Sequence, residues 1–353
     1  MSGYRRYYFP NTEALGPNEM RIIALGTGRP YMRPAQANTG WLIELGNGDK
    51  FMFDFGFGTQ MRFSALEISY QDITAYFASH LHSDHVGDFG QIWVASWVGG
   101  RTKPLVVYGP SGAEPKYGMA HFVQKQRESF EWDTATRVGF LPAVGEEIEV
   151  HEFDYSKTAA IYEANGVRIT SFPAIHIMDG PVGFRLEWNG LTLVYSGDTT
   201  PNGFLIQNAK NADVVIHDTY NTIDQMVANT GHDKKGGSAV NTYIHTDPFD
   251  AGRIFSMVRP RLAVSFHFYN DFDTASEIER EIRKNYDGPL ALSHDLMVIN
   301  VTKEGIATRL ASTGSNVYPN TTYQEAYRRA PRKPRPVLSS WLSEQRLFLK
   351  EQG

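Results

Sequence analysis

The segment Ser79–Asp88 reads SHLHSDHVGD and carries three histidines and one aspartate within six positions. It directly follows ITAYFA, an apolar run that is typical of a buried strand. Where a strand runs into such a loop, alternate side chains point to the same side, so His80 and His82 suit one metal ion. Asp84 and His85 then turn toward a neighbouring position. Packing offers no reason for such a cluster, which therefore predicts a metal centre at the end of a strand.

Three further ligand candidates lie far along the chain, each just after an apolar run that is typical of a strand. His176 occurs in SFPAIHIMDGPVGF, Asp198 in LVYSGDTT and His267 in LAVSFHFYN. A sandwich of two sheets would bring the ends of these strands back to one edge. The predicted metal ligands are His80, His82, Asp84, His85, His176, Asp198 and His267.

Composition narrows the chemistry that the chain can carry out. The chain has 353 residues, 41% of them hydrophobic, which is enough for a large buried core. It has no cysteine, so disulfides, thiolate metal sites and cysteine nucleophiles are excluded and metal binding falls to histidine and carboxylate. The net charge of −5 provides no general basic field, so we expect a small-molecule substrate rather than a nucleic acid.

Neither a secretory signal nor a membrane span is expected. Residues 1–20 contain no apolar core of about 7–15 residues, which a signal peptide would need. Nowhere do about 18 apolar residues follow one another. The sequence therefore predicts a cytoplasmic protein without a membrane partner.

Two series of strand-like and helix-like segments divide the chain. The first comprises Arg21–Leu25, Trp41–Leu45, Phe51–Phe55, a helix over Thr59–Leu66 and Ile73–Phe77. The second comprises Val167–Phe172, Gly183–Trp188, Leu191–Ser196, a helix over Asn202–Ala209, Val214–His217, a helix near Pro248–Val258 and Leu262–Ser265. Two halves of sheet plus helix predict an α/β fold, an αββα sandwich.

We expect one domain over residues 1–316 and a C-terminal arm over 317–353. Residues 110–162 are rich in aromatic and acidic residues without an obvious place in either sheet, which predicts a lid or a dimer-contact insertion. The arm carries the basic cluster RRAPRKPRP and the amphipathic segment VLSSWLSEQRLFL. It is expected to pack on the body or on a second subunit, with a nucleic-acid patch as the alternative. Exposed aromatic residues flanked by charges favour a homodimer.

The sequence resembles a known family at several motifs. HLHSDH matches the HxHxDH signature of the metallo-β-lactamase superfamily, and the later His, Asp and His follow in the order that this family uses. The motifs ALGTGRP, FDFGFGTQ, YGPSG, YSGDT and SHDLMVINV look most like its ribonuclease Z branch. The resemblance covers the chain from Met20 to about Thr302 and implies the metallo-β-lactamase sandwich and a metal-dependent hydrolase.

The resemblance also implies how the ligands divide between two divalent ions. One ion would be held by His80, His82, His176 and Asp198, and the other by Asp84, His85, His267 and the shared Asp198. The expected ion is Zn²⁺, and a site of oxygen and nitrogen ligands can also take manganese or iron. Two such ions would lower the pKa of a bridging water, so that hydroxide is available as the nucleophile.

Other residues are predicted to support this chemistry. Asp84 is expected to orient the nucleophile, and His245, in IHTDP, to donate a hydrogen bond to the negative charge that develops on the substrate. The alternative for His245 is a surface or helix-capping position. Asp54, His217 and Asp218 are expected to brace the metal ligands.

Four histidines, His121, His151, His232 and His294, are expected to lie outside the site. No spacing argument links them to the metal ligands. We place His121 and His151 on the surface and His232, in GHDKKGG, in a loop.

The leading functional prediction is hydrolysis of a small organic, aromatic substrate: an ester, a sulfate ester or an aryl halide. The first half and the insertion are rich in aromatic side chains that could line a pocket for such a ring, although they could equally form core or an interface. The candidate pocket residues are Trp93, Trp97, Phe130 and Trp132.

Two other functions remain open. A ribonuclease Z that processes tRNA 3′ ends usually has His-Glu-Ala-Thr where this chain has residues 217–220, HDTY, and its tRNA-gripping arm is rich in glycine and lysine rather than acidic. A diiron protein of oxygen chemistry could use similar ligands on the same fold. A purely structural zinc site is disfavoured because such sites prefer closed cages of four ligands, often with sulfur.

Overall fold

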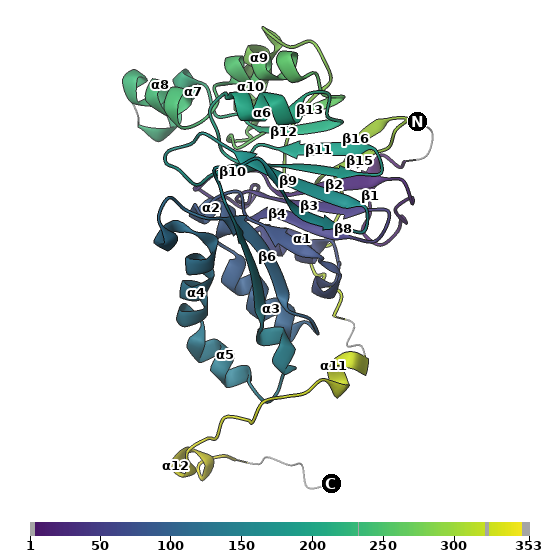
Figure 1. Cartoon of the computed structure of the whole chain (residues 1–353), viewed down its shortest axis with the longest axis vertical. Helices are drawn as coiled ribbons and strands as arrows, with labels where there is room; N and C mark the ends of the chain where they lie inside the picture. Colours follow the sequence, from purple (N-terminus) through teal and green to yellow (C-terminus); the bar gives the residue numbers. More distant parts are fainter. Residues whose placement is uncertain (1–3, 232, 322–324, 348–353) are drawn as a thin grey trace.

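Two sheets lie face to face in the computed structural model, which describes residues 4–231, 233–321 and 325–347 (Figure 1). Within these residues the first sheet has, in spatial order, β1 (Tyr7–Tyr8), β16 (Ile306–Ala311), β15 (Met297–Val301), β2 (Met20–Gly26), β3 (Gly40–Leu45), β4 (Lys50–Phe55), β5 (Ala75–Phe77), β6 (Leu105–Pro110) and β7 (Ile148–Phe153). The second has β14 (Leu290–Leu292), β13 (Leu262–Phe266), β12 (Val214–Asp218), β11 (Leu191–Tyr195), β10 (Val182–Trp188), β9 (Val167–Pro173) and β8 (Ala159–Ala164).

Helices cover the outer faces of both sheets. The first half contains α1 (Thr59–Ala65), α2 (Ser83–Val86), α3 (Phe89–Val98), α4 (Met119–Ser129) and α5 (Glu131–Arg137), with 3₁₀ turns at η1 (Tyr70–Asp72), η2 (Pro115–Tyr117) and η3 (Ala143–Glu146). The second half contains α6 (Gly203–Ala209), α7 (Ile223–Thr230), α8 (Lys234–Tyr243), α9 (Pro248–Val258) and α10 (Phe272–Arg283). The predicted αββα sandwich is confirmed.

The alternation of side chains along each strand builds the layers. In β4, Phe51 and Phe53 face the core between the two sheets, whereas Met52 faces the core beneath the helices of the first half. The left-handed backbone of Asp54, with a φ of 57°, interrupts this alternation, so Phe55 also faces the helices. A third core joins the second sheet to α6, α9 and α10. Because both faces of a strand are buried, the strands read as nearly continuous apolar runs, which is why the sequence revealed them.

The expected insertion over residues 110–162 contributes to both sheets, contrary to the prediction. Its β7 pairs in parallel with β6, and its β8 pairs antiparallel with β9, while α4 packs on β6 and β7. Both strands lie at sheet edges and are only partly buried, so they tolerate the acidic residues that hid them in the sequence.

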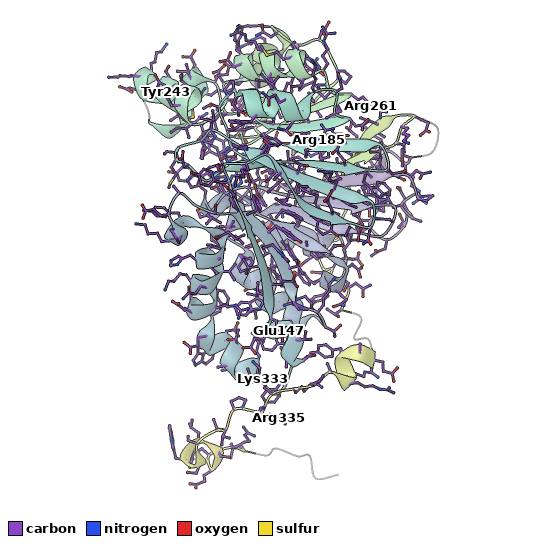
Figure 2. All side chains as sticks on the ribbon, viewed as in Figure 1. Glu147, Arg185, Tyr243, Arg261, Lys333 and Arg335 are labelled. Atoms are coloured by element: carbon purple, nitrogen blue, oxygen red, sulfur yellow. The ribbon has the colours of Figure 1, made fainter. Side chains whose placement is uncertain are left out.

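The C-terminal arm begins by packing on the body and then leaves it. It includes the short helices α11 (Glu325–Arg329) and α12 (Ser340–Ser343). The Ala143 amide donates to the Pro331 carbonyl at 2.9 Å, and the Lys333 ammonium pairs with Glu146 at 2.7 Å. Figure 2 labels Lys333 and Arg335 on this part of the arm. Beyond these contacts the arm extends past the end of α5 (Figure 1).

No helix in the described part of the chain is both long and apolar enough to cross a membrane.

Candidate metal centre

The first four predicted ligands lie where β5 ends. The loop after β5 presents His80 and His82, and His82 caps α2, which carries Asp84 and His85 in its single turn. The Val86 amide donates to the His82 carbonyl at 3.1 Å, which holds the loop and the helix as one unit. The short spacing of the HxHxDH motif therefore places all four side chains on one side of the sheet edge.

Asp54 braces this loop from the end of β4, as the sequence predicted. Its fully buried carboxylate accepts hydrogen bonds from the Ser79 amide at 2.7 Å, the His85 Nδ1 at 2.7 Å and the Tyr195 hydroxyl at 2.6 Å. Since Nδ1 of His85 is the donor to Asp54, its Nε2 is the ring nitrogen that faces the metal centre. Burial and the nearby carboxylate raise the pKa of Tyr195 well above its usual value, so this phenol remains a donor.

The remaining predicted ligands come from strand ends of the second sheet. His176 follows β9, Asp198 follows β11, and His267 follows β13 directly. β11, β12 and β13 are parallel neighbours, so their carboxyl ends meet at one edge. The backbone of His267 has a φ of 73°, a left-handed conformation that is costly for a residue other than glycine.

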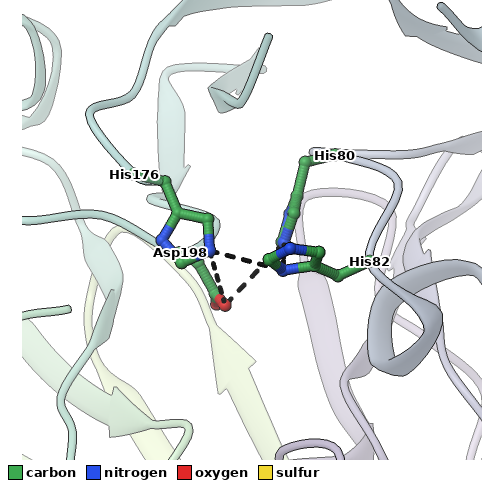
Figure 3. A group of neighbouring side chains, drawn as sticks. All are labelled: His80, His82, His176 and Asp198. Carbon is green, nitrogen blue, oxygen red and sulfur yellow. Dashed lines mark hydrogen bonds and ion pairs between the residues drawn. The ribbon is translucent and has the colours of Figure 1, made fainter. Parts of the chain in front are cut away.

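His80, His82, His176 and Asp198 form the first group (Figure 3). The Nδ1 of His82 lies 3.0 Å from Nε2 of His80 and 3.3 Å from Nε2 of His176. Ligand nitrogens about 2.1 Å from a tetrahedral zinc ion would lie about 3.4 Å apart, close to this spacing. Burial lowers the pKa of His176 to about 4 and that of His80 well below its usual value, so both rings are neutral and can bind a cation.

Asp84, His85 and His267 form a second group beside the first. The Nε2 of His267 lies 3.2 Å from Asp84 Oδ2. Asp198 reaches this group too, because its Oδ1 lies 3.2 Å from His85 Nε2 and its Oδ2 lies 3.5 Å from His267 Nε2. Asp198 is thus the carboxylate that the two groups share.

His245 joins the cluster through Asp218 at the end of β12. Its Nδ1 donates to Asp218 Oδ2 at 2.9 Å and lies 3.9 Å from Asp198 Oδ2. Burial opposes a charge on His245, but the Asp218 carboxylate outweighs this effect and raises its pKa. These two residues, with Asp198 and His267, form a further group whose ligand atoms lie within 4.8 Å of one another.

The donor atoms of this cluster fit divalent metal ions. His85 Nε2 and Asp198 Oδ1 are buried and have no hydrogen-bond partner, which is costly unless a cation binds between them. The set contains only nitrogen and oxygen, which zinc, manganese and iron all accept. The structure thus brings the seven predicted ligands together, and their assignment to individual ions stays a prediction.

A cavity of about 360 Å³ opens beside the first group, lined by His82 and His176 among others. The sequence interpretation missed its walls, which come from η2, α4 and the loop after β9. His121, expected on the surface, is half-buried and lines this cavity. The available signal was the exposed apolar pair Ile177 and Met178 next to a predicted ligand.

The aromatic residues that were expected to line a pocket lie elsewhere. Trp93 and Trp97 are buried in α3, where their indole N–H groups donate to the carbonyls of Glu146 at 3.1 Å and Pro142 at 2.7 Å. Trp132 is 80% exposed on α5.

Phe130 packs against the core of the first half rather than lining the cavity. The prediction was wrong because the rings of α3 face inward onto the sheet. Of the other histidines, His151 lies partly exposed on β7 as expected, His217 is fully buried, and His232 lies outside the described residues.

Several known proteins are similar to this chain in sequence. A family profile described as "Anti-Pycsar protein Apyc1" matches residues 20–115. The ribonuclease Z of Mycobacterium bovis (strain BCG / Pasteur 1173P2) is 31% identical over 204 residues, which cover 56% of this chain and 69% of that protein. The ribonuclease Z of Mycobacterium marinum is 31% identical over 56% of this chain and 70% of its own length.

Several solved structures share the fold of this chain. The metallo-β-lactamase fold protein YhfI from Bacillus subtilis superposes with a TM-score of 0.61 at 18% identity, over 80% of this chain and all (100%) of its own. The short form of human tRNase Z has a TM-score of 0.58 at 20% identity, over 79% of this chain and 98% of its own. A diphosphatase of the PhnP family has a TM-score of 0.53 at 14% identity, over 79% of this chain and 96% of its own.

The chain belongs to the metallo-β-lactamase superfamily, in its ribonuclease Z-like branch, and is a metal-dependent hydrolase. The predicted superfamily, fold and enzyme class are therefore confirmed.

Proposed function

We propose that this chain is a dinuclear hydrolase of small phosphodiesters. The observation that carries the proposal is the position of Asp198, whose two carboxylate oxygens reach both groups of predicted ligands. Phosphoester chemistry is supported by the names of the related proteins, ribonuclease Z and diphosphatase. The proposal therefore replaces the predicted ester, sulfate ester or aryl halide with a phosphodiester.

The proposed ligands divide as the family resemblance implied. His80, His82, His176 and Asp198 would hold one ion, and Asp84, His85, His267 and Asp198 the other. When bound, divalent ions activate water and polarise the bond under attack. Zn²⁺ is the leading ion, with manganese and iron as alternatives.

Two side chains complete the proposed chemistry. Asp84 is held at 3.2 Å from His267, and its carboxylate can accept a hydrogen bond from the attacking water and so orient it. His245 is held by Asp218 and favours its charged form, so it can donate to the negative charge that develops on the phosphoryl oxygens.

The size of the substrate follows from the surroundings of the cluster. The cavity of about 360 Å³ suits a small organic group. Helix α4 beside it and the following α5 carry mixed charges, and β7 carries further acidic residues, so this part of the chain offers no basic surface for an RNA backbone. A second candidate is cleavage of precursor tRNA, which the names of the curated relatives support.

The test is a comparison of substrates with the metal-reconstituted protein. Bis(4-nitrophenyl) phosphate, 4-nitrophenyl sulfate, 4-nitrophenyl acetate, a chlorinated aromatic compound and a precursor tRNA are assayed side by side. We expect turnover of the phosphodiester and none of the tRNA. Asp198→Asn should abolish this turnover, whereas Asp213→Asn, at an ion pair with Arg261 away from the cluster, should not.

Other outcomes separate the alternatives. Preferred turnover of the sulfate, the acetate or the halide contradicts the phosphodiester proposal. Removal of the tRNA 3′ trailer selects the second candidate. Iron in the purified protein together with oxygen consumption supports a diiron protein instead.

A further inference from the structure

The cavity beside the metal centre is bounded by both halves of the sandwich. On one side Tyr117 of η2 and Phe122 of α4 line it, and on the other Ile177 and Met178 of the loop after β9. His82, a predicted ligand of the first group, forms part of the same wall. A molecule bound in this cavity therefore lies directly against the candidate metal centre.

The walls of the cavity are unusually apolar for an accessible surface. Tyr117 is 45% exposed, Ile177 is 59% exposed and Met178 is 51% exposed. Covering such side chains with a ligand removes apolar area from water, which favours binding. Their gathering at one cavity next to a reaction centre indicates a binding surface for an apolar group.

The charged residues of the cavity are largely neutralised within the protein. The Lys116 ammonium lies 3.0 Å from Glu114 and 4.7 Å above the ring of Tyr117, and Lys125 lies 2.7 Å from Glu128. Asp179 also lines the cavity, so its charged residues have both signs, and its apolar side chains favour shape and apolarity over charge. Negative charge on a substrate would instead meet the cation site formed by the first group.

We infer that this cavity binds an aromatic ring of the substrate while the phosphodiester lies at the metal centre. A ring fits because Tyr117, Phe122 and the Met178 thioether all make favourable contacts with aromatic faces or edges. At about 360 Å³ the cavity accepts one or two rings and excludes a folded polymer. This inference rests on the proposed function.

The test measures binding without turnover. Phenylphosphonate and methylphosphonate carry the same anion and a stable carbon–phosphorus bond, and they differ only in the ring. Calorimetric titration of the zinc-loaded protein gives the ratio of their dissociation constants. We expect the phenyl compound to bind about tenfold more tightly, because its ring covers apolar side chains.

Matched variants test which side chains cause the preference for phenylphosphonate. The double variant Tyr117→Ser/Met178→Ser should lose the preference for the ring and keep the affinity for methylphosphonate. Met257→Ser is the control, because Met257 is 54% exposed, like Met178, but lies on α9 away from the cavity. Metal content and thermal unfolding midpoints should be equal in all three proteins, since the substituted side chains are about half exposed.

Each result has a distinct meaning. A ring preference that disappears only in the double variant supports the inference. Equal binding of the two phosphonates by the unaltered protein, or a preference that survives in the double variant, overturns it and leaves the proposed function intact. If neither phosphonate binds, the phosphodiester proposal fails, and the inference fails with it.

Discussion

The ring of Tyr220 lies parallel to the ring of His245, with 4.2 Å between the centroids and 3° between the planes. Tyr220 also contacts the buried guanidinium of Arg29, which lies 4.2 Å from its centroid and 3.8 Å from that of Tyr269. A ribonuclease Z usually has threonine at the position of Tyr220. The stack therefore restricts rotation of the His245 ring about its side-chain bonds.

Loss of the stack should slow catalysis without loss of metal. Tyr220→Leu is expected to lower kcat about tenfold because a catalytic donor that is free to rotate is less often in place. Tyr220→Phe keeps the ring and should retain most of the activity. Steady-state kinetics with metal analysis check this, and an equal loss in the two variants would assign the role to the hydroxyl instead.

The carboxylate of Asp54 should control metal affinity although Asp54 is not itself a predicted metal ligand. Asp54→Asn removes the charge that holds His85 Nδ1 and Tyr195, and we expect metal affinity to fall about 10–100-fold. Zinc titration against a competing chelator measures the change. Asp133→Asn, at an exposed ion pair on α5, is the control and should bind zinc normally.

His82 lies at the exposed side of the first group and contributes little to the core. His82→Ala should therefore stay folded, lose at least one metal ion and lose nearly all activity. Metal analysis, circular dichroism and turnover of bis(4-nitrophenyl) phosphate provide the readouts. Full activity in a metal-depleted His82→Ala protein would contradict the assignment of the metal site.

His245 should behave differently from the ligands. His245→Ala is expected to keep both metal ions and to lower kcat about 10²–10³-fold, as the loss of a donor to developing charge does. If metal is lost instead, His245 is a ligand of the group that it forms with Asp198, Asp218 and His267.

The arm is expected to contribute to a homodimer. Val337 is 95% exposed, Trp341 is 67% exposed and Leu347 is 80% exposed, an apolar surface that a second subunit would cover. Removal of residues 337–353 should shift the molar mass measured by light scattering from dimer to monomer. An unchanged molar mass would show that the arm makes no essential subunit contact.

The sequence by itself determined the features that depend on neighbouring residues. The nearly continuous apolar runs predicted the main strands, because strands buried on both faces need apolar side chains throughout. The spacing of His80, His82, Asp84 and His85 predicted one metal centre, because the geometry of a short loop follows from its length. The edge strands β7 and β8 were not predicted, because their partial exposure lets them carry charged residues that interrupt the apolar pattern of a strand.

Only the tertiary structure decided the surroundings of that centre. Packing of η2 and α4 at the first sheet places Tyr117 at the same cavity as Met178, and packing of α3 turns Trp93 inward, away from that cavity. Arg29 and Tyr220 meet across 191 positions of the chain because β2 and β12 belong to different sheets whose ends converge. Such contacts depend on how the layers pack together, and no local pattern of residues records that packing.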